Sequence, residues 1–200
     1  MADSTYPIPG SLPAAPRRWS QAAVLEWLNS WVITVDHKKL GLMYMIYSIF
    51  FLLVGGAEAI AIRIQLFHPN MHFLSPQVFN RIFTMHGTTM VFLVGMTYIF
   101  GFANYLIPLM VGARDMAFPR LNAFSFWLTF FGGLLLYYSF IGGSGLYGAG
   151  NAPDVMWWAY APLTERAFSP GHAPDYWALS LIVTGFGTIG ASITTWVGRW

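Results

Sequence analysis

The sequence predicts an all-α integral membrane protein with four spanning helices, and three observations support this prediction. Of its 200 residues, 56% are hydrophobic and only 9% are charged, and the mean hydropathy is +0.53. A soluble domain carries about 25% charged residues, so this composition is typical of a chain surrounded by lipid. Four apolar stretches reach the roughly 20 residues that a helix needs to cross a bilayer. Because lipid offers the backbone no hydrogen-bond partners, these stretches are expected to be helices rather than open strands.

The spanning stretches are expected at residues 40–62, 82–111, 121–143 and 176–198. Glu58 is the only charged residue in any of them. Residues 1–33 are expected to form a cytoplasmic N-terminal tail with a short interfacial segment, because this part lacks the apolar core of a secretory signal. Residues 34–200 are expected to form one transmembrane domain.

The basic residues in the connections predict the orientation. When the connections are assigned alternately to the two sides of the membrane, one side holds seven Lys and Arg residues and the other holds three. By the positive-inside rule the side with seven, which includes the N-terminus, is cytoplasmic. The net charge of +2 is too small to indicate a nucleic-acid partner.

A histidine in the second stretch is the candidate metal or haem ligand. The chain has no cysteine, so a metal must be held by histidine, carboxylate or methionine. His86 is expected about 12 Å from the outer end of its helix. A neutral imidazole is a common ligand for metals and for haem iron, and Gly87, Thr88 and Thr89 would let a flat macrocycle approach. The alternative is a histidine that is hydrogen-bonded inside the helix bundle.

Two charged residues of the first helix are further candidates. Because consecutive spans are antiparallel, Arg63 and His86 are expected in one layer, where Arg63 could bond a polar edge of a cofactor. The alternative for Arg63 is to extend to the lipid headgroups. Glu58 is costly in lipid unless it is partnered, and a spacing of five residues does not favour Arg63. Its partner is therefore expected on another helix.

An acidic residue on the cytoplasmic side predicts a route for protons. Asp115 lies in the connection after the second stretch, and Asn104 and Asn122 lie near the helix ends on either side of it. An acid at the water boundary with amides leading inward is one form that a water-filled proton entrance can take. A solvated loop acid is the alternative.

Four motifs resemble subunit I of the haem–copper oxidases, and together they are specific. They occupy residues 34–41, 83–90, 104–122 and 157–163 within a resemblance that covers about residues 33–192. The resemblance implies the first four helices of a twelve-helix fold. Ligands for the high-spin haem and copper B are not among these 200 residues, so the chain is expected to be a fragment.

The resemblance implies roles for three haem-side residues. His86 matches an axial ligand of the low-spin haem, expected to be haem a, and Arg63 matches the arginine that bonds the formyl group of that haem. Trp157 matches a loop tryptophan near the propionates of the high-spin haem. An interfacial aromatic belt is the alternative interpretation of the Trp157 loop.

The resemblance also implies a proton path on the cytoplasmic side. Asp115 matches the acid at the entrance of the D-channel, and Asn104 and Asn122 match its first amides. Tyr44 falls at a tyrosine along the same path.

The implied function is that of a proton-pumping terminal oxidase of a bacterial inner membrane, which oxidises cytochrome c and reduces oxygen to water. The implied partners are the remainder of subunit I, a copper-bearing subunit II and subunit III. A quinol oxidase is a less favoured alternative, because quinol-oxidising members have Arg, His and Gln at the positions of Val54, Val78 and Arg81. A split or non-catalytic four-helix subunit that acts in structure or assembly is the rival from another class.

Overall fold

The computed structural model describes residues 20–142 and 152–197. It divides the chain into two compact units, Met1–Ile33 and Thr34–Trp200. The described part of the first unit is one helix, α1 (Gln21–Val32), which the hydroxyl of Ser20 caps by accepting the amide of Ala23 at 3.1 Å. No residue of α1 is buried, and its two tryptophan rings lie 5.9 Å apart. Its placement at a membrane interface stays a prediction.

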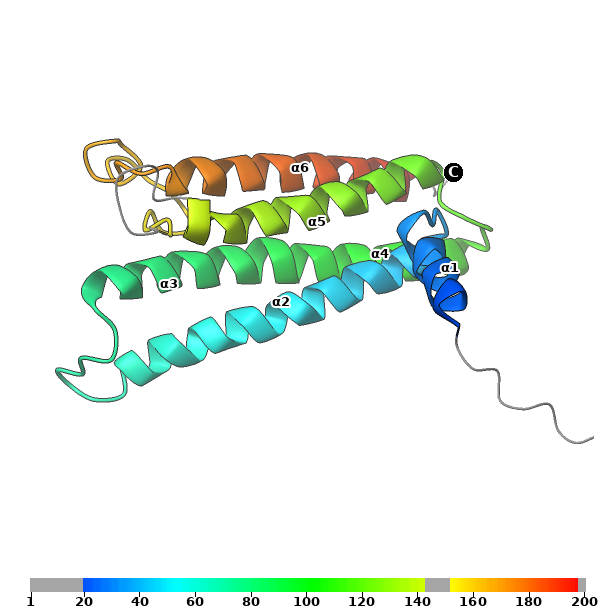
Figure 1. Ribbon diagram of the computed structural model, residues 1–200. Helices are drawn as coiled ribbons and strands as arrows, with labels where there is room; N and C mark the ends of the chain where they lie inside the picture. The colour runs from blue at the N-terminus through cyan, green and yellow to red at the C-terminus, as the bar shows by residue number, and fades with distance from the viewer. Residues whose placement is uncertain (1–19, 143–151, 198–200) are drawn as a thin grey trace, which may run out of the picture. The chain divides into compact units, whose positions relative to one another are not determined.

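The second unit contains four helices that are long and apolar enough to cross a membrane. The second of these crossings is continuous through three segments, α3, η1 and α4. The order is α2 (His37–Gln65), α3 (Pro76–Thr88), η1 (Thr89–Met96), α4 (Thr97–Val111), α5 (Pro119–Gly142) and α6 (Ala173–Val197) (Figure 1). This confirms the predicted class of an all-α membrane protein. Gly143 and Gly198, at the ends of two predicted stretches, lie outside the described residues.

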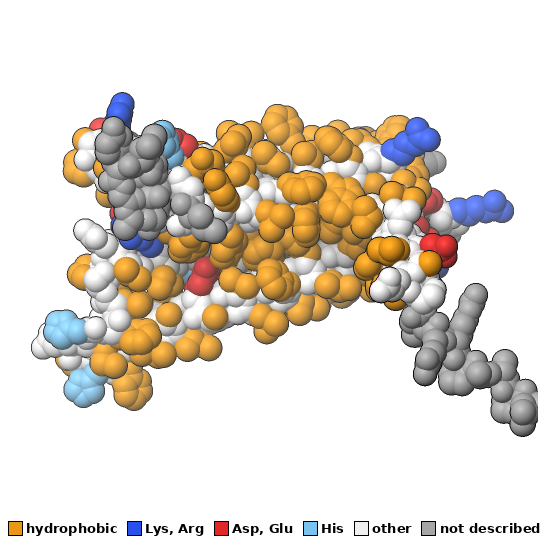
Figure 2. All heavy atoms as spheres, viewed as in Figure 1, with side chains coloured by type: hydrophobic (Ala, Val, Ile, Leu, Met, Phe, Trp, Pro, Cys, Tyr) orange, Lys and Arg blue, Asp and Glu red, His pale blue; other side chains and the backbone are white. Residues whose placement is uncertain are grey.

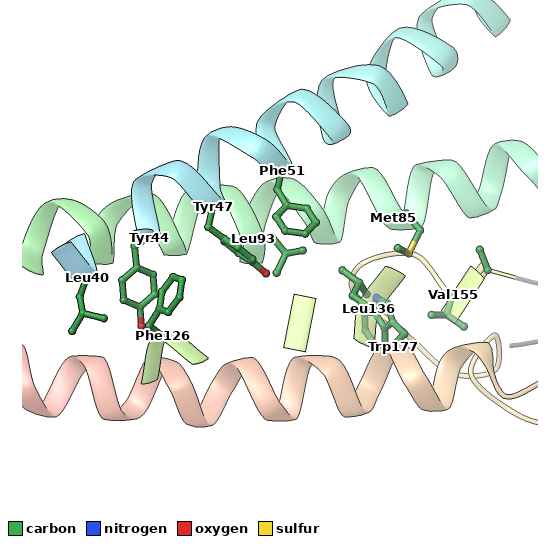
Figure 3. Packing of buried hydrophobic residues seen from close by; sticks show 11 residues of the cluster. Leu40, Tyr44, Tyr47, Phe51, Met85, Leu93, Phe126, Leu136, Val155 and Trp177 are labelled. Carbon is green, nitrogen blue, oxygen red and sulfur yellow. The ribbon is translucent and has the colours of Figure 1, made fainter. Parts of the chain in front are cut away.

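Consecutive spans run antiparallel, so the bundle has two ends at which the spans alternately begin and finish (Figure 1). We call the end where α2 and α5 begin the Asp115 end, and the end where α2 and α5 finish the Arg63 end. Figures 1 and 3 show that α2 is inclined to the second span and diverges from it toward the Arg63 end. Figure 2 shows hydrophobic side chains along the spans, while most charged side chains gather near the two ends.

Local signals in the sequence place the ends of the helices. The carboxylate of Asp36 caps α2 by accepting the amides of Lys38 and Lys39 at 2.7 and 3.2 Å. At the start of α3, Ser75 caps the helix and is followed by Pro76, a residue that suits a first turn. Gly112 ends α4 with φ of 70°, in the left-handed region that glycine enters at little cost.

The middle of the second span is a wide π-helical segment, η1, which begins three residues after His86. A π-helix shifts backbone hydrogen bonds out of the α-helical register and often occurs at functional sites. Two hydroxyls support the carbonyl of Val94 in this segment, from Ser48 of α2 at 3.0 Å and from Thr97 at 3.3 Å. The wide segment is therefore tied directly to α2.

Small residues bring the helices close together. A Cβ added to Gly41 of α2 would lie 2.9 Å from the carbonyl oxygen of Gly101 on α4. A Cβ added to Gly187 of α6 would lie 2.8 Å from the carbonyl oxygen of Ser125 on α5. Helices in lipid associate through close packing, so these contacts stabilise the two helix pairs. Between the helices lies a core whose larger members include Leu40, Tyr44, Tyr47, Phe51, Met85, Phe126, Leu136 and Trp177 (Figure 3).

Two glycine-to-alanine variants of α2 test the close packing. We expect Gly41→Ala to destabilise the protein by about 1–3 kcal/mol, because its new methyl group meets backbone that cannot move aside. Gly56→Ala is the matched control, since a Cβ there meets no atom within 4 Å. Thermal unfolding of the complex in detergent measures both variants. Equal midpoints for the two variants would contradict the packing described here.

Candidate functional site

His86 is held on α3 by a hydrogen bond to α2. Its Nδ1 lies 2.9 Å from the carbonyl oxygen of Gly55. A carbonyl only accepts, so Nδ1 carries the proton and the neutral ring has its lone pair on Nε2. Nε2 makes no hydrogen bond with any described residue. A ring held through one nitrogen and free at the other is the form in which histidine ligates metals and haem iron, so His86 fits that role.

The loop before α6 covers the helix beside His86. A Cβ added to Gly87 would lie 2.9 Å from Cδ1 of Trp157, and the amide of Met156 donates to the hydroxyl of Thr84 at 3.0 Å. The close approach at Gly87 is therefore used by the Trp157 ring, and the expectation that this face accepts a macrocycle is wrong. The contact places Trp157 next to His86.

Thr88 and Thr89 face other helices. Both are fully buried. The indole nitrogen of Trp177 on α6 donates to the hydroxyl of Thr88 at 2.9 Å, and the hydroxyls of Thr89 and Tyr137 lie 2.7 Å apart. These two threonines therefore fix the His86 segment against α5 and α6 and do not line an open face.

Glu58 has a partner on another helix, as expected, and that partner is Tyr137 of α5. The hydroxyl of Tyr137 donates to Oε1 of Glu58 at 3.2 Å, so the hydroxyl of Thr89 is left to donate to Tyr137. The second carboxyl oxygen, Oε2, is buried and has no hydrogen-bond partner among the described residues. Tyr137 was not identified as a site residue from the sequence.

Arg63 does not share a layer with His86. It lies eight residues beyond Gly55, the α2 residue that His86 contacts, which is about 12 Å along the helix. Its side chain is exposed and makes no hydrogen bond or ion pair with any described residue. The level of the His86–Gly55 contact on α2 therefore shows that the expectation of one layer is wrong.

At the other end of the bundle, Asp115 contacts a histidine that the sequence did not single out. Nδ1 of His37 lies 3.2 Å from Oδ1 of Asp115, which also accepts the amide of Met116 at 2.8 Å. The side chain of Asp115 is 35% exposed and that of His37 only 5%. Nε2 of His37 is buried and has no partner among the described residues. The pair therefore joins a water-accessible acid to a buried polar group.

Asn104, Asn122 and Tyr44 are buried polar residues toward the same end. Asn104 and Asn122 are fully buried, and Tyr44 is 1% exposed. The amide oxygen and nitrogen of both asparagines, and the hydroxyl of Tyr44, have no hydrogen-bond partner among the described residues. Buried polar atoms in native structures are nearly always satisfied, often by ordered water.

Helix packing relates these buried groups to one another. Tyr44 and Asn104 each lie three residues after the Gly41–Gly101 contact, so each shares a face with it. The Tyr44 ring also packs edge-on against Phe126 of α5 at 5.0 Å, as Figure 3 shows, and Asn122 lies one turn before Phe126. Three helices thus each contribute a buried polar side chain to this part of the bundle.

The described residues do not form a closed metal site. No group of three or more His, Cys, Asp or Glu side chains within residues 20–142 and 152–197 could hold a metal ion. His86 can supply one ligand, so a six-coordinate haem iron at this position needs a second axial ligand from elsewhere.

These features define a multi-pass membrane protein. One span carries a histidine whose Nε2 is available to ligate a metal, and buried polar side chains lie toward one end of the bundle. The chain belongs to the family of cytochrome c and quinol oxidase polypeptide I, whose model matches residues 39–199. This confirms the resemblance inferred from the motifs.

Curated relatives include oxidases with both kinds of electron donor. The chain is 45% identical to cytochrome c oxidase subunit 1 of Corynebacterium efficiens over 167 residues, covering 82% of this chain and 28% of that protein. It is 48% identical to cytochrome c oxidase subunit 1 of Bacillus subtilis over 166 residues, covering 83% and 25%. It is 42% identical to quinol oxidase subunit 1 of the same species over 165 residues, covering 82% and 24%. The chain therefore spans about a quarter of the length of these relatives.

Proposed function

We propose that this chain forms the low-spin haem side of subunit I of a cytochrome c oxidase, which reduces oxygen to water and pumps protons. The observation that carries the proposal is His86, whose Nδ1 is held by the Gly55 carbonyl while Nε2 has no hydrogen-bond partner in the described part of the chain, which belongs to this family. Haem a, when bound, supplies one-electron transfer. The second axial ligand, the high-spin haem and copper B belong to the remainder of subunit I.

Two residues toward the Arg63 end are proposed to contact haem groups. The exposed guanidinium of Arg63 has no partner among the described residues, so it is free to donate to a haem formyl group. Trp157 packs beside His86 on Gly87, and its indole nitrogen is proposed to donate toward a propionate of the high-spin haem.

The Asp115 end is proposed to take up protons. Asp115 is reached by water and contacts buried His37, while Tyr44, Asn104 and Asn122 present buried polar atoms that have no hydrogen-bond partner among the described residues. Unpaired polar atoms are costly in an apolar interior, and bound water relieves that cost. Water bound by these groups would connect Asp115 to the interior of the bundle. Asp115 would take up protons from the surrounding water at the entrance of this path.

The orientation and the assembly complete the proposal. The N-terminus and the Asp115 end lie in the cytoplasm of a bacterium, with residues 1–33 as tail and interfacial segment and residues 34–200 in the inner membrane. The His86 half of the bundle then faces outward, where cytochrome c binds. A copper-bearing subunit II passes the electrons on, and subunit III completes the core complex.

Cytochrome c is proposed as the electron donor because Val54, Val78 and Arg81 replace the Arg, His and Gln of quinol-oxidising members. We expect the complex isolated from native membranes to consume oxygen rapidly with reduced cytochrome c and much more slowly with a reduced quinol. Oxygen-electrode rates with each donor, blocked by cyanide as a control, measure this preference. Faster oxygen consumption with the quinol would overturn the assignment of the donor.

A further inference from the structure

We infer that Glu58 and Tyr137 are positioning residues for His86, because with Thr89 they close a ring of hydrogen bonds over three helices that fixes the imidazole plane. The inference rests on the proposed role of His86 and names residues that act on it. Among the described residues, no hydrogen bond joins Glu58 or Tyr137 to His86. Their effect is transmitted by the two helices that they hold together.

The ring consists of two bridges that cross between α2 and the second span. Gly55 and Glu58 are three residues apart and share a face of α2, as His86 and Thr89 do on the second span. Because these spans are antiparallel, the two bridges join opposite corners of one contact, in which Gly55 also lies beside Thr89. The first bridge is His86 Nδ1 to the Gly55 carbonyl at 2.9 Å. The second is the hydroxyl of Tyr137, 2.7 Å from Thr89 and 3.2 Å from Glu58. Helices joined at two points on one face can neither slide nor rotate without breaking a bridge.

Packing between the two bridges leaves little room for adjustment. A Cβ added to Gly55 would lie 2.9 Å from Sδ of Met90 and 3.4 Å from Cγ2 of Thr89, so α2 and η1 touch there. The ring of Tyr137 is itself held, with its centroid 5.3 Å from that of Phe51. This ring contact helps to fix the position of the Tyr137 hydroxyl between Thr89 and Glu58.

The chemistry of Glu58 agrees with this role. A carboxyl group inside a spanning helix is costly, and such groups are rare unless they have a function. Its one hydrogen-bonded oxygen, Oε1, serves the Tyr137 bridge. The group that accepts from a ligating histidine sets the orientation and basicity of its ring. The contacts that fix the Gly55 carbonyl against His86 therefore also affect the haem iron, because they set the orientation and basicity of the histidine that would ligate it.

The test uses the complete complex, with redox titration and low-spin ferric EPR of the haem. We expect Tyr137→Phe to shift the midpoint potential of the low-spin haem by at least about 28 mV. This shift corresponds to a threefold change in the equilibrium constant for its one-electron reduction. The EPR signal should change as well, because it reports the orientation of the axial imidazole. Tyr138→Phe is the matched control, since Tyr138 is the next residue of α5 and is 47% exposed. It should match the native complex.

Two variants of Glu58 separate positioning from charge. Glu58→Gln removes the charge but keeps an oxygen that accepts from Tyr137, so it should retain most of the native potential and EPR signal. Glu58→Leu removes the acceptor and should behave like Tyr137→Phe. Combining Glu58→Leu with Tyr137→Phe should add nothing to the larger single effect, because both changes break the same bridge.

The outcomes distinguish this inference from the proposed function. If Tyr137→Phe assembles with full haem content and native potential and EPR, the inference is wrong, as it is if Glu58→Gln shifts as far as Glu58→Leu. If Tyr137→Phe does not assemble, Thr89→Val breaks the same bridge with a side chain of similar shape, and a native result there overturns the inference. A native complex with no low-spin haem signal would instead overturn the proposed function.

Discussion

His86→Ala is expected to abolish the low-spin haem band of the complex. The substitution removes the Nε2 lone pair that would ligate the iron, together with the Nδ1 hydrogen bond to Gly55. Alanine offers no donor atom, and no other His side chain is described within the second span. Reduced-minus-oxidised spectra of the purified complex measure the loss, and oxygen consumption with cytochrome c should disappear with the band.

His72→Ala provides the control for that experiment. His72 is an exposed histidine between α2 and α3, and its replacement should leave the spectrum unchanged. Subunit content, measured on the same preparations, separates haem loss from failed assembly. A His86→Ala complex that assembles and keeps a normal low-spin band would show that His86 is not the ligand.

Asp115→Asn is expected to slow turnover by roughly tenfold to 10²-fold and to reduce the number of protons pumped per electron. Asparagine keeps the size of the side chain and an oxygen that can accept from the amide of Met116. It loses the charge and the ability to bind and release a proton at the water boundary. Stopped-flow pH measurements on reconstituted vesicles give the proton stoichiometry, and oxygen consumption gives the rate.

The control is Asp36→Asn, which removes a negative charge at the start of α2. Asparagine is as good an N-cap as aspartate, so the cap of α2 persists. We expect native turnover and native pumping in this variant. Native proton stoichiometry and native turnover in Asp115→Asn would contradict the proposed uptake of protons at Asp115.

Those parts of the structure that depend on local composition could be predicted from the sequence. The four spans follow from runs of apolar residues, and capping residues such as Asp36, Ser75 and Gly112 account for several helix ends. His86 could be selected because it is a polar ligand type inside an apolar run. Each of these inferences needs only residues that are close together in the chain.

Contacts between distant segments could not be predicted in this way. Tyr137 and Glu58 are 79 residues apart, and His37 and Asp115 are 78 residues apart. Their meeting depends on how three helices pack, which no periodicity within one helix encodes. The errors have the same origin. Arg63 lies outside the layer of His86 because His86 meets α2 at Gly55, eight residues earlier, and Gly87 is covered because a loop tryptophan packs on it.

The central claim is that His86 belongs to a haem site, and the most direct measurement is the reduced-minus-oxidised spectrum of the native complex, isolated through a tag on this chain. Pyridine extraction of the same sample identifies the haem. We predict a low-spin haem a band, with haem A in the extract and a protein partner that supplies the second axial ligand. A complex that contains this chain in full amount but no haem would contradict the account, and would favour a structural or assembly role for the four helices.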